Sequence, residues 1–506
     1  MTPIAPSAKT DEGASTALGR FIGKFTVLRD SIPELWIVFG IKILGIAAYG
    51  LTNSTIVPWL VSDFGYSDPH ALHTVAAWSL LMSAVTLLVG SLTDVLGMRR
   101  TLYLGTVICL AARFVMVAAP SPGLALWGGL MPLAIGEALG GPVLIAAARR
   151  YSNTRQRSVS FSIIYAMMNL GFLLAAFLFD HLRKGLGEYG RHEVLGAHLS
   201  TYRIIFLTSF ILEALMLPLI YLLREGAEAS DEGLKIVPPK PGPGGSGFHS
   251  IGATLAEAAR QTGRLFVTLV EQAGFYRLLA FLVLIAFVKL IYRQMDYVYP
   301  IFGIRELGPG APIGMLWGLN SLFVIILVPI IGALTQKFSA YSMVIVGCLI
   351  SSASVFIMAM PPAWFGAMAG GLPGYVVGRK YLGLTGDIHP YYVMIALFVF
   401  LLSVGESFYS PRVYEYAAAI APKGQEASYG ALSYVPLLLP KLLIGLFSGE
   451  SLMRYCPPTG PRHSETLWLI VALLSLVAPV GLIAFRPWIR VHEAGREDDE
   501  PVNGTT

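Results

Sequence analysis

The sequence predicts an all-α polytopic membrane protein in which twelve transmembrane helices form two pseudo-symmetric six-helix halves. The 506 residues are 55% hydrophobic and only 13% charged, whereas about a quarter of the residues in a soluble globular protein are charged. Apolar runs of about 20 residues, the length that spans a bilayer as a helix, recur along the whole chain. A Pro- and Gly-rich stretch divides these runs into six and six.

The N-terminal half is predicted at 36–223, after a cytoplasmic segment at 1–35. The first 34 residues contain no short apolar segment with a cleavage site, so we expect no removable signal peptide. Runs bounded by charges, Pro and Gly mark the expected spans. They lie near 36–60, 72–93, 101–119, 123–147, 159–180 and 202–223.

A cytoplasmic linker is predicted at 224–276, because PPKPGPGGSG at 238–247 is too rich in Pro and Gly for a buried helix. Residues 250–266 have helical apolar spacing and fit either a helix on the membrane surface or an ordinary linker helix. The C-terminal half follows at 277–486, and a cytoplasmic tail at 487–506. Its runs lie near 277–302, 312–335, 341–360, 391–411, 429–449 and 466–486.

The positions of Lys and Arg predict the orientation, because cytoplasmic loops carry an excess of both. Basic residues gather before the first run, between the second and third, and between the fourth and fifth, while the first two outer loops hold none. We therefore expect both termini in the cytoplasm, in a plasma or inner membrane. Later outer segments depart from this pattern with Arg183, Lys184, Arg191, Arg379 and Lys380.

Short matches between the halves indicate an internal repeat. GEALGGP at 136–142 matches GESFYSP at 405–411, so Glu137 corresponds to Glu406, and IKIL and VKLI place Lys42 opposite Lys289. Chance similarity between apolar segments is the alternative. An ionisable residue at mid-bilayer costs at least about 2.5–3.5 kcal/mol and faces a cavity or a partner charge. The four residues therefore suggest one central polar site in which the lysines neutralise the glutamates.

The segment GSLTDVLGMRR at 90–100 resembles the signature loop of the major facilitator superfamily. The glycines of such a loop permit close helix approach and a tight turn, and its charges can latch one half against the other. The corresponding segment at 332–342 keeps Gly332 but lacks the acid and the second glycine. The predicted latch residues are Gly90, Asp94, Gly97, Arg99 and Arg100.

Within that superfamily, the chain resembles a divergent member of the proton-dependent oligopeptide transporter family. FSIIYAMMNLG at 161–171 resembles the fifth span of that family, through Tyr165 and Asn169 among others, and LNSLFVIILVP at 319–329 its eighth. GESFYSP matches the tenth, which implies that Glu406 lines the substrate site. The first-span E-x-x-E-R cluster would fall on 41–45 and is absent, and Gly141 replaces the fourth-span lysine.

Further charges lie within the predicted spans. Lys289, Arg293 and Asp296 are spaced four and three residues apart and share one helical face. Arg293 and Asp296 either neutralise each other or take part in the site. Arg113 and Lys441 are expected to extend to the membrane interface, as long cations near span ends do, and Glu213 is a weaker site candidate.

Together these features predict a secondary active transporter that moves a small organic solute by alternating access, with a proton gradient as energy source. Glu137 and Glu406 are the candidate proton carriers. An uncoupled facilitator and a non-transporting membrane receptor are the alternatives. An enzyme is disfavoured, because no nucleotide-binding loop, metal-ligand cluster or nucleophile elbow appears. We expect a monomer with no cofactor, no metal and no nucleic-acid partner.

Overall fold

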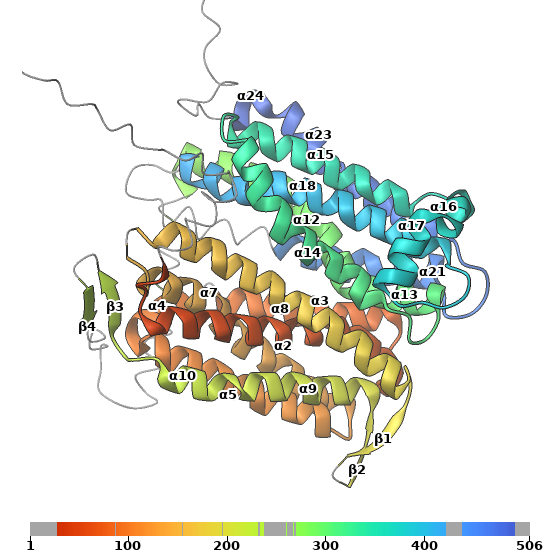
Figure 1. Ribbon diagram of the computed structural model, residues 1–506, viewed down its shortest axis with the longest axis horizontal. Helices are drawn as coiled ribbons and strands as arrows, with labels where there is room; N and C mark the ends of the chain where they lie inside the picture. Colours follow the sequence, from red (N-terminus) through yellow and green to blue (C-terminus); the bar gives the residue numbers. More distant parts are fainter. Residues whose placement is uncertain are drawn as a thin grey trace, which may run out of the picture.

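The computed structural model describes residues 28–86, 88–153, 155–194, 196–230, 233–236, 260, 267, 270–420 and 438–490. These residues are almost entirely helical. Figure 1 shows two groups of long helices, one built from the chain before the predicted linker and one from the chain after it. The all-α fold with two helical halves is therefore confirmed. The predicted helix at 250–266 lies almost wholly outside the described residues.

The N-terminal half contains six spans, three of which are built from more than one helical segment. A β-hairpin of β1 (Arg191–Val194) and β2 (Ala197–Ser200) connects the last two spans, and β3 (Ala227–Ser230) and β4 (Gly233–Ile236) follow them. The helices are α2 (Pro33–Phe64), α3 (Asp68–Thr86), α4 (Val89–Leu96), α5 (Met98–Ala118), α6 (Pro122–Leu124), η2 (Ala125–Leu130), α7 (Met131–Arg150), α8 (Arg157–Leu186), α9 (Thr201–Ala214) and α10 (Met216–Leu222).

The C-terminal half has the same plan. The helical segments of its spans are α12 (Ala273–Tyr297), α13 (Tyr299–Leu307), α14 (Ile313–Leu334), α15 (Ala340–Met358), α18 (Pro390–Ile420), α20 (Leu438–Leu443), η6 (Ile444–Ser448), α21 (Gly449–Tyr455), α22 (Ser464–Ser475), α23 (Val477–Ala484) and α24 (Arg486–Ile489). The expected loop at 361–390 instead contains short helical turns that contact α18. These are η3 (Pro362–Phe365), α16 (Gly366–Gly370), α17 (Leu372–Gly374) and η4 (Tyr375–Tyr381).

Within the described chain, ten helices are long and apolar enough to cross a membrane. The second span is α3, and the eleventh is described only from Leu438, as α20, η6 and α21; the two pack against each other where the halves meet. A Cβ on Gly445 would lie 2.5 Å from Cβ of Ala76, and one on Gly449 would lie 2.5 Å from Cα of Pro69. The two halves are therefore in close contact along these helices.

Glycines next to the repeated glutamates pack in the same way in both halves. A Cβ on Gly136 of α7 would lie 2.9 Å from the carbonyl oxygen of Gly105 on α5. In the second half, a Cβ on Gly405 of α18 would lie 2.7 Å from the carbonyl oxygen of Gly347 on α15. Each glutamate is thus positioned by a close helix contact that only glycine permits, and this supports the internal repeat.

Ion pairs join the halves at the distal end, by which we mean the end of the bundle away from Pro33 and Ile489. Asp68 at the start of α3 accepts two hydrogen bonds from Arg305 of α13, at 2.8 and 2.9 Å. Figure 1 shows α13 and α21 at this end, together with β1 and β2. Both partners are buried or nearly so, with exposed side-chain fractions of 3% and 11%.

A second distal contact joins the end of α8 to the start of α14. Asp180 accepts hydrogen bonds from the backbone N–H groups of Gly314 (2.9 Å) and Met315 (2.6 Å), so an acid of one half caps a helix of the other. Arg183 is completely buried, pairs with Asp180 and Glu188, and donates to the carbonyl oxygen of Ala311 at 3.2 Å. These contacts explain why Arg183 lies in an outer segment although the orientation pattern places few basic residues there.

Glu188 links the same two segments just outside the membrane span. It accepts hydrogen bonds from Arg183, from the hydroxyl of Tyr202 and from the backbone N–H of Gly310 (2.9 Å). Burial raises the pKa of Glu188, but Arg183 and Tyr202 outweigh burial, so its pKa lies below the ordinary value. The stabilisation is therefore fully present at neutral pH and is lost as the pH falls through this lowered pKa.

Replacing Glu188 with glutamine is expected to loosen the distal contact, because Arg183 loses one of its two charged partners. Hydrogen–deuterium exchange of the segment around Gly310 should then become faster at neutral pH. Glu193→Gln is the matched control, since Glu193 is exposed on β1. Equal exchange in Glu188→Gln and the control would show that this carboxylate does not hold the segment.

Candidate functional site

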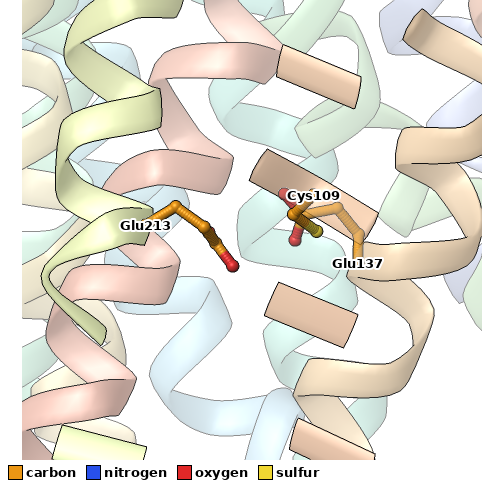
Figure 2. A group of neighbouring side chains, drawn as sticks. All are labelled: Cys109, Glu137 and Glu213. Carbon is orange, nitrogen blue, oxygen red and sulfur yellow. The ribbon is translucent and has the colours of Figure 1, made fainter. Parts of the chain in front are cut away.

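The N-terminal half contains a buried ion cluster around Arg113 of α5. This arginine is completely buried. Its Nη2 donates to Oε1 of Glu137 on α7 at 2.5 Å, and its Nη1 donates to Oε2 of Glu213 on α9 at 3.2 Å. Figure 2 shows Glu213 pointing from its own helix toward Glu137 and Cys109. The third, fourth and sixth spans thus meet at one guanidinium.

The expectation that Arg113 extends to the membrane interface is wrong. An extended arginine needs water at its end, and here two carboxylates 24 and 100 residues away in sequence replace that water. Residues this far apart in sequence leave no local spacing pattern from which the contact with Arg113 could be predicted. Glu213, which the sequence offers only as a weaker site candidate, therefore belongs to the cluster. The feature of the sequence that could have indicated this is an acidic residue in the middle of the sixth span.

Cys109, Glu137 and Glu213 could in principle hold a metal ion, since one ligand atom from each lies within 4.8 Å of the others. The guanidinium of Arg113 already donates to both carboxylates. A cation thus occupies the centre of the acid pair, and the arrangement fits an ion triad better than a metal site.

A cavity of about 190 Å³ opens beside this triad. Gly140 and Gly141 of α7 form part of its wall, and a Cβ on either would meet no atom within 4 Å, so these glycines keep the space open. Its other charged and polar lining residues include Lys42, Tyr49, Thr106, Glu137 and Glu213. The cavity therefore gives both acids access to a space that can hold several waters.

Lys42 lines the same cavity from α2 and is only 5% exposed. Among the described residues, no acid lies within ion-pair distance of it. Lys42 is therefore not the partner of Glu137, and the predicted neutralisation of Glu137 by a lysine is wrong. The reason is that Arg113, from the third span, already occupies this place.

The C-terminal half places Glu406 in a second buried polar cluster. Glu406 of α18 is 9% exposed and accepts a hydrogen bond from Nδ2 of Asn320 on α14 at 3.1 Å. Lys289 of α12 lies in electrostatic range of Glu406, although the two make no ion pair in the described part of the chain. Its Nζ lies 4.8 Å from the ring centroid of Tyr409, one turn further along α18. This half therefore balances one acid with one cation.

Arg293 and Asp296 of α12 pair with each other, with Nη1 of the arginine 2.8 Å from Oδ2 of the aspartate. This agrees with the structural alternative stated for them. Lys441 of α20 lies in electrostatic range of both and donates to Oγ of Ser83 on α3 at 3.0 Å. The expectation that Lys441 extends to the interface is therefore wrong, because its ammonium group bonds to the other half.

The predicted fifth-span residues lie on α8 near the contact between halves. Nδ2 of Asn169 donates to the carbonyl oxygen of Tyr165, one turn earlier, at 3.0 Å. Tyr165 also lies in electrostatic range of Tyr409 in the C-terminal half. Tyr165 thus faces the Glu406 cluster, while the described hydrogen bond of Asn169 stays within its own helix.

The signature loop makes its described contacts within one half. Gly97 has φ = 82°, which separates α4 from α5 by a turn that favours glycine. Arg99 lies over the ring of Tyr221 at 5.1 Å, and Nε of Arg100 is 3.1 Å from Oε1 of Glu225. The arginines therefore do not bridge the halves in this conformation. The side chain of Asp94 lies outside the described part of the chain, as does the environment of Gly90.

The geometry predicts which charge pairs are coupled. In double-mutant cycles on melting, Lys289→Ala with Glu406→Gln should show a coupling of about 0.5–3 kcal/mol, because Lys289 lies in electrostatic range of Glu406. Lys42→Ala with Glu137→Gln should be nearly additive. Additivity of the Lys289 cycle, or strong coupling in the Lys42 cycle, would contradict the assignment.

Comparisons with known proteins agree with this architecture. A family model described as Major Facilitator Superfamily matches residues 38–384. A solved structure of a proton dependent oligopeptide transporter aligns with a TM-score of 0.62 and 18% identity, covering 90% of this chain and 98% of the other. No curated protein matches by sequence.

Two further structures are similar. A POT family transporter in complex with 5-aminolevulinic acid aligns with a TM-score of 0.64 and 16% identity, covering 90% of this chain and 96% of the other. Tetrameric PepTSo2 aligns with a TM-score of 0.62 and 17% identity, covering 90% and 98%. At such identities the similarity shows the shared fold.

Proposed function

Because the chain belongs to the major facilitator superfamily, we propose that this secondary transporter couples the movement of a small organic solute to a proton gradient. The observation that carries the proposal is the buried glutamate at equivalent places in the two halves, Glu137 and Glu406. Each sits in a site with a cation, from Arg113 and Lys289 respectively. A buried acid next to a cation can gain and release a proton as its surroundings change.

The distal ion pairs fit one state of an alternating-access cycle. Asp68 with Arg305, and Asp180 with the start of α14, close the distal end. With both termini in the cytoplasm, as the basic loops predict, this end faces outward and the protein is closed to the outside. Opening requires these pairs to exchange partners or take up water, so they are the expected gate.

The substrate class can be tested by screening, among other compounds, ligands that similar proteins bind. We expect thermal-shift screening against dipeptides, 5-aminolevulinic acid, amino acids, organic acids and nucleosides to reveal a stabilising ligand, since a molecule that binds only the folded state raises its melting point. Counterflow of that ligand in proteoliposomes then tests transport. Binding without counterflow would favour a non-transporting receptor.

No cofactor is needed for this mechanism, and a single chain contains both halves of the site. A monomer is therefore proposed as the working unit. The tetrameric relative makes the oligomeric state worth measuring directly. Light scattering in detergent together with counterflow at low protein-to-lipid ratio separates a monomeric transporter from an obligate assembly.

A further inference from the structure

The ion triad of the N-terminal half is unbalanced. Glu137 and Glu213 both bond to Arg113, which is the only basic side chain within ion-pair distance of either acid among the described residues. The other titratable groups facing the triad are Cys109 from α5 and Tyr49 and Lys42 from α2, which line the same cavity. Lys42 makes no ion pair with either acid in the described part of the chain, so if both acids were ionised, the triad itself would carry a net negative charge.

Burial makes this net charge costly. The exposed side-chain fractions are 0% for Arg113, 12% for Glu137 and 6% for Glu213. Two carboxylates that share one buried site do not both ionise readily, and an uncompensated buried charge is strongly unfavourable. Protonation of one acid restores neutrality while both retain a bond to the guanidinium.

We infer that Glu137 and Glu213 together hold one proton, with Arg113 as the positioning residue, and that this pair is the proton-binding site of the N-terminal half. The inference rests on the proposed function for its role in transport, but the bound proton itself does not. The C-terminal half differs, because Lys289 and Glu406 balance one to one.

The adjacent cavity can hold water that accepts the proton. Both glutamates line it, and its volume of about 190 Å³ leaves room for several waters. On release, the O–H bond of the protonated carboxyl breaks and the proton passes to a cavity water. The resulting carboxylate then pairs more strongly with Arg113. Uptake is the reverse, so the charge of the triad alternates between neutral and negative.

Infrared spectroscopy of the purified full-length protein tests the bound proton without any substrate. A protonated carboxylic acid has a C=O stretch well separated from that of a carboxylate. The difference spectrum between wild type and Glu213→Gln should show loss of such a band at neutral pH, and so should that for Glu137→Gln. In each variant one acid remains for one arginine, so no proton is needed.

Glu225→Gln is the matched control, because Glu225 pairs one to one with Arg100 at the surface. This variant should keep the band. Retention of the band in both cavity variants would overturn the inference. Loss in only one of them would also overturn it, because the proton would then belong to that residue alone.

A second measurement covers the case in which a variant does not fold. Wild-type protein containing glutamate labelled with ¹³C at the side-chain carboxyl should shift the band to lower frequency. Absence of a shifted band would mean that no glutamate is protonated and would overturn the inference. If the band behaves as expected but uptake does not respond to pH, the proposed function fails while the proton site stands.

Discussion

Replacing Arg113 with methionine is expected to destabilise the protein by about 3–5 kcal/mol at neutral pH, the usual cost of removing one partner from a buried ion pair. Glu137 and Glu213 would remain buried without the cation that pairs with both of them. The loss should shrink as the pH falls, because protonation of both acids removes the uncompensated charge. Thermal melting in detergent across a pH series measures it.

Two further variants make this result specific. Adding Glu137→Gln and Glu213→Gln to Arg113→Met should recover much of the lost stability, since neutral groups then replace the whole triad. Arg99→Met is the matched control, because the described contact of Arg99 is with the face of Tyr221. If Arg113→Met has the same melting temperature as Arg99→Met at every pH, the triad does not stabilise the fold.

Replacing Glu406 with glutamine is expected to abolish gradient-driven accumulation of the substrate. The change removes an acid that lies in electrostatic range of Lys289, and it removes a group that could carry a proton. Because each 1.4 kcal/mol corresponds to a factor of ten, a gradient of one pH unit coupled to one proton supports about tenfold accumulation. In Glu406→Gln, the internal substrate concentration should rise only to the external concentration.

Counterflow without a gradient separates the two roles of Glu406. Counterflow persists if the residue carries the proton, and it is lost if the residue binds a cationic group of the substrate. Glu415→Gln is the control on the same helix, where Glu415 pairs with Arg412. Full concentrative uptake by Glu406→Gln would remove this residue from the mechanism.

The fold could be predicted well because spanning a bilayer imposes a simple rule on sequence. Apolar runs of sufficient length mark helices even without knowledge of their partners. The limits follow from the same rule. The helical turns from η3 to η4 were expected as a loop, because short segments of mixed polarity carry no length signal.

The site could be predicted only where it follows the repeat. Glu406 and Lys289 were found because their surroundings recur in the first half. Arg113 was misjudged because the repeat breaks there, and Val355 stands one helix turn after Ser351, in the place that Arg113 has after Cys109. A cation without a counterpart in the other half cannot be placed by internal similarity.

The distal contacts were not predictable for a different reason. Asp180 and Glu188 bond to backbone N–H groups of Gly314, Met315 and Gly310. Every residue except proline offers such a group, so the acceptor side chain in one half gives no indication of its partner in the other. Only the folded arrangement of α8 and α14 brings them together.

Uptake into proteoliposomes under an imposed proton gradient tests the central claim most directly. With a ligand found by thermal shift, we predict accumulation above the external concentration when the gradient is present, and its collapse to equilibrium when a protonophore is added. Uptake that reaches equilibrium equally fast with and without the gradient, and never exceeds it, would contradict proton coupling and identify an uncoupled facilitator.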